Sequence, residues 1–152
     1  MIVIVDSGGA NLISITSAVA RLAKHVIVSS AIQDIEQASH IILPGVGSSE
    51  TVMNRLNTLG LVKVLKATTK PVLGICVGMQ VLFEFSEEGA TPCLGLLNGI
   101  VKKLPIIANL CLPHMGWNTI KTCASSALMQ DIPQDAYVYY VHNFAVPVSH
   151  NT

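Results

Sequence analysis

The chain has 152 residues, no formal net charge, 12% charged residues and 51% hydrophobic residues, with a mean hydropathy of +0.56. The near-neutral charge argues against a basic face for nucleic acid, and Pro, Gly and charged residues interrupt every apolar run before it could cross a membrane. The segment Met1–Asp6 has no basic leader and reaches a carboxylate too early for a signal peptide, so we expect a cytoplasmic protein.

The first half of the chain alternates short apolar runs with stretches of helical spacing. Strands are predicted at 2–5, 25–28, 41–43 and 71–75, and helices at 11–23, 32–38, 50–66 and 78–85. Pro44-Gly45 should stop the third strand. This alternation indicates an α/β doubly wound sheet, mostly parallel with flanking helices. The high hydropathy fits strands buried on both faces, an interface with another chain, or both.

The second half of the chain reads differently. From Asn98 onward the pattern predicts antiparallel strands at 99–104, 117–121 and 137–146, with a helical turn at 126–131. We therefore expect one domain, residues 1–152, with an α/β first part and a β-rich second part. Cys93, Cys111 and Cys123 are expected to be free, small, buried or half-buried residues. The cysteine spacing does not suggest a zinc site, and we expect neither a metal nor a cofactor.

The motif Gly74-Ile75-Cys76-Val77-Gly78 lies between a predicted strand and a predicted helix. This arrangement is typical of a nucleophile elbow, in which small residues on either side allow the neighbouring chain to approach closely. The following helix would direct its first N–H groups at the sulfur and favour the thiolate. The alternative is a structural cysteine at a glycine-rich strand end; the position directly after an apolar strand favours the nucleophile.

A second glycine-rich turn, Pro44-Gly45-Val46-Gly47, follows the third predicted strand. Ligands bind beyond the carboxyl ends of parallel strands, so both turns should lie at the same edge of the sheet. The N–H of Val77 would help to stabilise an oxyanion, and the 44–47 turn could supply another donor. The alternative is that this second turn is an ordinary connection between a strand and a helix.

At this point the sequence resembles a known family along nearly its whole length. The segment 70–80, KPVLGICVGMQ, is similar to the nucleophile region of class I glutamine amidotransferases, which have a flavodoxin-like fold. The motifs SEEG (86–89), LGLL (94–97), PHMGWN (113–118) and YYVH (139–142) resemble the glutaminase subunits of imidazole glycerol phosphate synthases. The opening DSGGANL (6–12) is similar to that family's D-Y-G-x-G-N-L.

The resemblance implies a role for each matching position. Cys76 would attack the side-chain amide of glutamine, giving a thioester and ammonia. Val77, Val46 and Gly47 would form the oxyanion hole, and Gln80 with the backbone at Asn143 and Phe144 would hold the substrate. Ammonia would pass to a (β/α)₈-barrel cyclase in histidine biosynthesis. The residues implied at that interface are Pro113, His114, Met115, Gly116, Trp117, Asn118 and Tyr139. Without the resemblance, Trp117 could equally be a core residue.

The sequence departs from the family at several positions. The residues given end at Thr152, before the family's late Q-F-H-P-E-type motif with the base and its orienting Glu, so we expect a C-terminally shortened form. That would uncover apolar surface and favour self-association. Ser7 stands in place of Tyr, Gly8-Gly9-Ala10 alters the G-x-G turn, and Asn143 replaces Ser or Thr.

Three functions remain open from the sequence. The first is a glutaminase that delivers ammonia to a cyclase. The second is a catalytically silent binding subunit or remnant, suggested by the missing His and Glu. The third is a related cysteine-elbow hydrolase that acts on another small substrate and uses His142 as its base. His25 and His40 sit at strand starts and look structural or exposed, and His150 lies close to the final residue.

Overall fold

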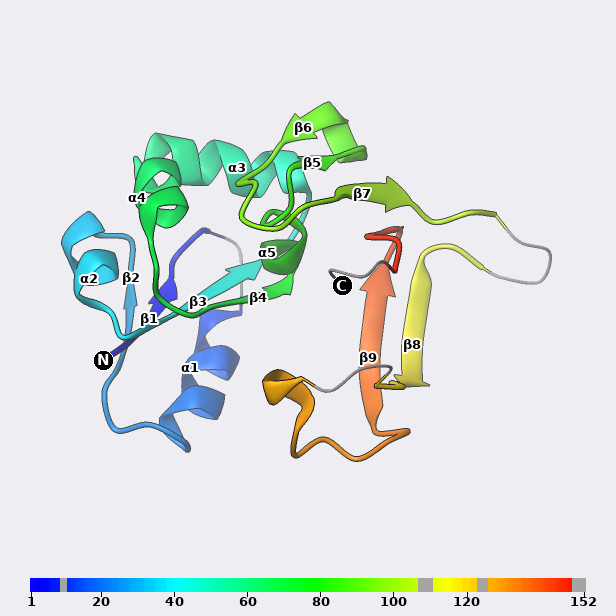
Figure 1. Cartoon of the computed structure of the whole chain (residues 1–152), viewed down its shortest axis with the longest axis horizontal. Helices are drawn as coiled ribbons and strands as arrows, with labels where there is room; N and C mark the ends of the chain where they lie inside the picture. The colour runs from blue at the N-terminus through cyan, green and yellow to red at the C-terminus, as the bar shows by residue number, and fades with distance from the viewer. Residues whose placement is uncertain (9–10, 107–110, 123–125, 149–152) are drawn as a thin grey trace. The chain divides into compact units, whose positions relative to one another are not determined.

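The structure is a computed structural model that describes residues 1–8, 11–106, 111–122 and 126–148 (Figure 1). The chain divides into two compact units. Unit 1 comprises Met1–Lys102 and Val146–Thr152, and unit 2 comprises Lys103–Ala145. Gly9, Ala10, Cys123 and His150 lie outside the described residues.

Unit 1 is built on a parallel sheet whose strand order is β2-β1-β3-β4. The strands are β1 (Ile2–Val5), β2 (Val26–Ser29), β3 (His40–Gly45) and β4 (Val72–Cys76). The helices are α1 (Leu12–Ala20), α2 (Ile32–Gln37), α3 (Ser49–Thr58), α4 (Leu61–Ala67) and α5 (Val77–Gln80). The α/β architecture predicted from the sequence is therefore confirmed.

Two predicted helices are shorter in the structure than in the prediction. The single helix expected at 50–66 is two helices, because Gly60 adopts a left-handed backbone with φ 70° between α3 and α4. The helix expected at 78–85 ends at Gln80, and the chain enters a short strand at Phe85.

The third strand does not stop at Pro44. It continues to Gly45, with Pro44 opposite Ile75 and Gly45 opposite Cys76 of β4. Proline disrupts a sheet by lacking an N–H for the ladder. Here the ladder between β1 and β3 has already ended at Ile4 and Ile42, so that side needs no N–H from Pro44.

The chain after α5 forms a small second sheet. It includes β5 (Phe85–Ser86), β6 (Thr91–Pro92) and β7 (Ile100–Lys103), with the 3-10 turn η1 (Glu88–Ala90) between the first two. β5 pairs antiparallel with β6 but parallel with β7. The strand expected at 99–104 is present as β7, but its pairing with β5 is parallel, not antiparallel. After the β5–β6 hairpin, residues 93–99 bring the chain back so that β7 starts beside β5.

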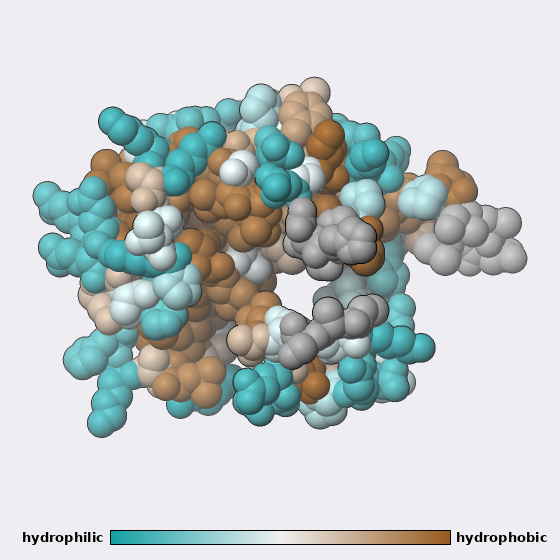
Figure 2. Space-filling view, in the orientation of Figure 1, coloured by the Kyte–Doolittle hydropathy of each residue, from teal (hydrophilic) through white to brown (hydrophobic). Residues whose placement is uncertain are grey.

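The core of unit 1 lies between one face of the sheet and the helices α2 to α5. Its fully buried members include Val3, Val5, Leu43, Val52, Leu56, Leu61, Leu65 and Val81. The other face of the sheet is covered by α1, which buries none of its residues fully. Leu73 and Ile75 of β4 remain 39% and 38% exposed. Figure 2 shows apolar side chains gathered over β4 and α1. Self-association through such surface stays a prediction.

Unit 2 contains an antiparallel ribbon of β8 (His114–Thr119) and β9 (Tyr137–His142), with β10 (Phe144–Ala145) after Asn143. The antiparallel pairing predicted for this region is confirmed, although β8 begins and ends earlier than the predicted 117–121. The predicted helical turn is present as η2 (Ala127–Met129). No helix within the described ranges is long and apolar enough to cross a membrane.

Leu56→Ala tests whether the packing of α3 on the sheet is the main support of unit 1. Leu56 is fully buried, so the substitution should lower the free energy of unfolding by about 2–5 kcal/mol. Urea denaturation followed by circular dichroism measures the change. The matched control is Leu22→Ala, because Leu22 is 90% exposed and its truncation should cost no more than about 0.5 kcal/mol. Equal losses in the two variants would contradict the assigned core.

Candidate active site

Cys76 lies on a sharp turn at the carboxyl end of β4. Its backbone angles are φ 56° and ψ −123°, and α5 begins at the next residue, Val77. Side-chain-bearing residues rarely adopt a positive φ, and such strain costs on the order of 1–3 kcal/mol. The cysteine side chain is exposed. The sequence predicted such an elbow, and the structure contains the turn.

The two glycines beside Cys76 are required by backbone contacts. A Cβ at Gly74 would lie 2.4 Å from the Cα of Met79, and one at Gly78 would lie 1.9 Å from the carbonyl oxygen of Leu43. Both distances are far below contact distance, and both neighbours are main-chain atoms that cannot rotate away. The elbow therefore packs directly against its own helix and against the end of β3.

The 44–47 turn lies beside the elbow. Gly45 is the register partner of Cys76, and a Cβ on Gly45 would lie 2.4 Å from the nitrogen of Gly78. Beyond this contact Val46 and Gly47 are exposed, and Gly47 has φ 83° with open space where a side chain would be. Both turns thus meet at one edge of the sheet, as the sequence predicted. Their roles in binding an oxyanion stay a prediction.

The N–H groups at the start of α5 give this edge its electrostatic character. The first N–H groups of a helix have no acceptor within it, so that of Val77 can donate to a bound oxygen atom. α5 is only four residues long, so this is an effect of local N–H groups. Gln80, in the same helix, is only 7% exposed, and its predicted contact with substrate remains untested.

The remaining cysteines differ from Cys76 in environment. Burial raises the pKa of the Cys93 thiol, which keeps it protonated and unreactive. Its buried position agrees with the sequence-based expectation. Cys111 is exposed, which corrects the expectation that it is buried or half-buried; it lies two residues before the PHMGWN motif, outside any helix or strand.

Neither described histidine of unit 1 is near Cys76. His25 precedes β2 and His40 opens β3, so both lie at the amino ends of parallel strands, whereas Cys76 ends β4. Both side chains are exposed, in agreement with the prediction. Within the described part of unit 1, no histidine is therefore placed to accept a proton from the Cys76 thiol.

His142 and His114 form a hydrogen-bonded pair in unit 2. The Nδ1 of His142 lies 2.9 Å from the carbonyl oxygen of Phe144, and its Nε2 lies 3.0 Å from the Nδ1 of His114. A carbonyl can only accept, so the Nδ1 of His142 carries the hydrogen, and in the neutral pair its Nε2 accepts from His114. Both nitrogens of His142 are thus engaged, which disfavours its use as a general base.

The backbone carbonyls expected near the substrate are used inside unit 2. The carbonyl of Asn143 accepts the Leu104 N–H at 2.8 Å, and that of Phe144 accepts the Nδ1–H of His142.

Comparison with known proteins resolves the family. The family model of class-I glutamine amidotransferases matches residues 3–151. This chain belongs to the class-I glutamine amidotransferases. The match runs through the elbow, the 44–47 turn and the segment of unit 2 that carries the histidine pair.

Individual relatives agree with this assignment. The chain is 45% identical over 146 residues to imidazole glycerol phosphate synthase subunit HisH 2 of Legionella pneumophila strain Lens, covering 96% of this chain and 73% of the relative. It is 44% identical to the HisH subunit of Xylella fastidiosa strain Temecula1, with 97% and 74% covered. A solved structure from Thermoplasma acidophilum matches with a TM-score of 0.68 at 18% identity, over 95% of this chain and 65% of that one, which supports the fold alone.

The amidotransferase residues predicted to contact a partner lie on two faces of the β8–β9 ribbon. Met115, Trp117 and Tyr139 share one face, where they are 60%, 70% and 55% exposed. Trp117 and Tyr139 pack edge to face with ring centroids 5.5 Å apart. His114 lies on the other face, where it stacks on Tyr140 at 4.8 Å. Of the remaining predicted residues, Pro113 and Asn118 are exposed and Gly116 is partly buried.

Sequence reasoning missed the side chains that hold the 44–47 turn of this amidotransferase at both ends. Before the turn, the Ser7 hydroxyl donates to the carbonyl oxygen of Pro44 at 2.8 Å. After it, the N–H of Ser49 donates to the Glu88 carboxylate at 2.9 Å, and the Ser49 hydroxyl donates to Ser86 at 3.1 Å. Glu88 and Ser86, the two partners of Ser49, both belong to the SEEG motif, which had been used only as evidence for the family resemblance.

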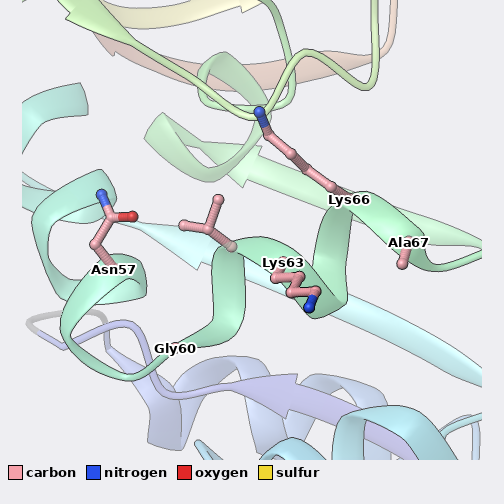
Figure 3. Close-up of a pocket in the computed structure, with 6 residues that line it drawn as sticks. Asn57, Gly60, Lys63, Lys66 and Ala67 are labelled. Carbon is pink, nitrogen blue, oxygen red and sulfur yellow. The ribbon is translucent and has the colours of Figure 1, made fainter.

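One hollow of unit 1 lies away from the elbow, and none of its lining residues belongs to the elbow or to the 44–47 turn. It has a volume of about 590 Å³ and is lined by the end of α3 and by α4, including Asn57, Gly60, Lys63 and Lys66. In Figure 3 the amino groups of Lys63 and Lys66 point in different directions, so they do not converge on one ligand.

Gly78→Ala tests the backbone contact beneath the elbow. Its Cβ would overlap the carbonyl oxygen of Leu43, so the variant should lose more than about 3 kcal/mol of stability or fail to fold. Thermal and urea unfolding measure this loss. The control is Gly95→Ala, because Gly95 has φ 65° and open space around its missing Cβ, so only left-handed strain of about 1 kcal/mol is expected. A Gly78→Ala protein as stable as the control would refute the close contact.

Proposed function

We propose that this chain is the glutaminase subunit of an imidazole glycerol phosphate synthase, with Cys76 as its nucleophile. The observation that supports this most strongly is the positive φ of 56° at Cys76, between two glycines that have no room for a side chain. Strain of this kind persists only where the surrounding packing enforces it, and such positions cluster at reactive sites. The identity of 45% to a HisH subunit supplies the substrate and the partner.

The reaction assigned to this edge is amide hydrolysis through a thioester. The Cys76 thiolate attacks the side-chain amide carbon of glutamine, and the N–H groups of Val77 and of the Val46–Gly47 turn receive the resulting oxyanion. The C–N bond then breaks, its electron pair stays with nitrogen, and a proton converts the leaving amide to ammonia. Water hydrolyses the thioester to glutamate and regenerates the thiol. Gln80, Asn143 and Phe144 are assigned to holding the substrate.

The proton transfers require a base and acid that the described part of unit 1 does not supply. His25 and His40 lie at the amino ends of their strands, and both nitrogens of His142 are engaged. This favours, as a second candidate, a subunit that binds the cyclase and glutamine without turning glutamine over. The two candidates differ in one measurable property, the production of glutamate.

The partner in the proposal is a (β/α)₈-barrel cyclase that consumes the ammonia. The surface assigned to it is the exposed apolar face of the β8–β9 ribbon: Met115, Trp117, Tyr137, Tyr139 and Val141. Rigid aromatic side chains in such a face are the usual energetic centres of an interface. We assign the main contacts with the cyclase to Trp117 and Tyr139, which lie on this exposed face. His114 lies on the other face and would support the ribbon internally.

Two further parts of the proposal concern the whole chain. Residues 1–152 belong to one glutamine amidotransferase type-1 domain, because the family match spans both units. The location is cytoplasmic, since a thiol nucleophile works only in its reduced form.

Cys76→Ala tests the assigned nucleophile. With glutamine, the cyclase subunit and the cyclase's nucleotide ligand present, the unchanged chain should release glutamate and the variant should show only the background rate, because the thioester cannot form. Glutamate is measured enzymatically against time. The matched control is Cys111→Ala, since Cys111 is also an exposed free thiol, and it should keep the original rate. If a folded, cyclase-bound wild-type chain releases no glutamate, the silent subunit becomes the better account.

Trp117→Ala tests the assigned docking face. Loss of an aromatic side chain from the centre of an interface costs about 2 kcal/mol or more, so the dissociation constant of the complex with the cyclase should rise about 30-fold. Isothermal titration calorimetry gives the constant. The control is Leu128→Ala, because Leu128 is 69% exposed in η2 of the same unit, and its affinity should stay within about twofold. Equal affinities of the two variants for the cyclase would show that Trp117 is not in the interface and that the cyclase binds another surface.

A further inference from the structure

Ser7 connects two neighbouring strand ends through a buried hydrogen bond. The residue is 3% exposed, and its hydroxyl donates to the carbonyl oxygen of Pro44 at 2.8 Å. The backbone at this point does not pair with β3. The N–H of Asp6 donates to the carbonyl oxygen of Ser29, the N–H of Ser7 donates to that of Val5, and the β1–β3 ladder has already ended at Ile4 and Ile42. The hydroxyl therefore extends the contact between β1 and β3 beyond the point where their backbones pair.

The atom that Ser7 holds determines the direction of the turn. The ring of Pro44 fixes its φ, and a hydrogen bond to its carbonyl oxygen also restricts its ψ, so the peptide plane between Pro44 and Gly45 has one orientation. The next two peptide groups carry the N–H groups of Val46 and Gly47. Gly45 packs against the nitrogen of Gly78, so the turn leaves this plane directly beside the elbow.

Little else fixes the exposed middle of the turn. Val46 is 41% exposed, and no atom lies within 4 Å of the position where Gly47 would carry a side chain. Glycine backbones have the most conformations to choose from. The turn is held at its end by the bonds from Ser49 to Glu88 and Ser86, and at its beginning by Ser7. Loss of either would widen the range of directions that the two N–H groups adopt.

From this geometry we infer that Ser7 is a positioning residue for the oxyanion-binding turn. It touches neither substrate nor the reacting atoms; it acts by holding the Pro44 carbonyl so that the Val46 and Gly47 N–H groups point toward the oxygen of a carbonyl under attack by Cys76. This inference rests on the proposed function, because it takes the oxyanion role of that turn from it. Preorganised donors stabilise an oxyanion only while their direction is fixed.

The experiment compares two reactions of the same sulfur. The first probe is an L-glutamine analogue with a chloromethyl ketone in place of its side-chain amide. Attack of the Cys76 sulfur on the carbonyl carbon gives an oxyanion; the sulfur then bonds to the chloromethyl carbon and displaces chloride as the carbonyl re-forms. The second probe is iodoacetamide, which alkylates by displacement of iodide and needs no oxyanion donor. Mass spectrometry of the peptide that contains Cys76 gives both rate constants for the full chain. Their ratio cancels changes in thiolate fraction and exposure, which a merely structural effect would alter.

Ser7→Ala should lower that ratio at least tenfold while the iodoacetamide rate stays within twofold of the wild type. Ser7→Thr keeps the hydroxyl and should restore the ratio to within threefold. Ser17→Ala, which removes an exposed hydroxyl on α1, should leave it unchanged. If Ser7→Ala does not fold, Ser7→Cys takes its place, because a thiol is similar in size but is a weak hydrogen-bond donor. This variant should also lower the ratio of the two rate constants.

The outcomes separate this inference from the proposed function. If the wild type prefers the L-ketone over its D-enantiomer but Ser7→Ala keeps the full ratio, Ser7 does not position the turn and the inference is overturned while the glutamine site stands. If the wild type reacts with both enantiomers at equal rates, no glutamine site exists at Cys76, and the proposed function is overturned together with the inference. A selective wild type with the tenfold loss in Ser7→Ala supports both.

Discussion

The direct backbone contact between the end of β3 and the first turn of α5 is the constraint on which the candidate site depends. A Cβ at Gly78 would lie 1.9 Å from the Leu43 oxygen, and a Cβ at Gly45 would lie 2.4 Å from the Gly78 nitrogen. No side chain fits between these segments, so α5 must start close to the sheet and Cys76 must turn through a positive φ. The strain at Cys76 costs on the order of 1–3 kcal/mol. Val77 in this short helix and Val81 directly after it are buried in the core, and each contributes about 1.5–3 kcal/mol, which is enough to offset it.

The same contact explains which parts of the site could be read from the sequence. A position with no room for a side chain must be glycine, and this requirement is visible in the sequence. The motifs G-x-C-x-G and P-G-V-G therefore predicted the two turns and their shared edge. Apolar runs also predicted β1 to β4. The central strands β1 and β3 are mostly buried and need a hydrophobic residue at nearly every position, whereas β4 keeps its apolar run although Leu73 and Ile75 are partly exposed. The break at Gly60 was missed because apolar spacing continues on both sides of it, from Leu56 to Leu61, and periodicity does not report a left-handed residue between two helices.

Hydrogen bonds between residues distant in sequence could not be predicted in this way. Ser7 and Pro44 are separated by 37 positions, and Ser49 and Glu88 by 39; serine and glutamate are common surface residues whose burial depends on the fold. Pro44 itself was taken as the end of a strand, because its missing N–H argues against pairing. Only the early end of the β1–β3 ladder makes that N–H unnecessary. The pairing of His114 with His142 likewise follows from the ribbon register, which the motifs PHMGWN and YYVH do not contain.

In the proposed reaction, the two halves of amide hydrolysis are supplied by different parts of the protein. The half that handles the electrophile, a strained exposed thiol with backbone donors beside it, is concentrated within a few residues of two adjacent strand ends. The half that moves protons is absent from that edge among the described residues of unit 1, whose histidines lie at the other ends of their strands. Backbone geometry of the first kind is set by packing and survives independently of any base, because steric exclusion at glycine does not depend on protonation. In the proposed reaction, the shape of the oxyanion site is therefore set by backbone packing, whereas turnover depends on the group that delivers the proton.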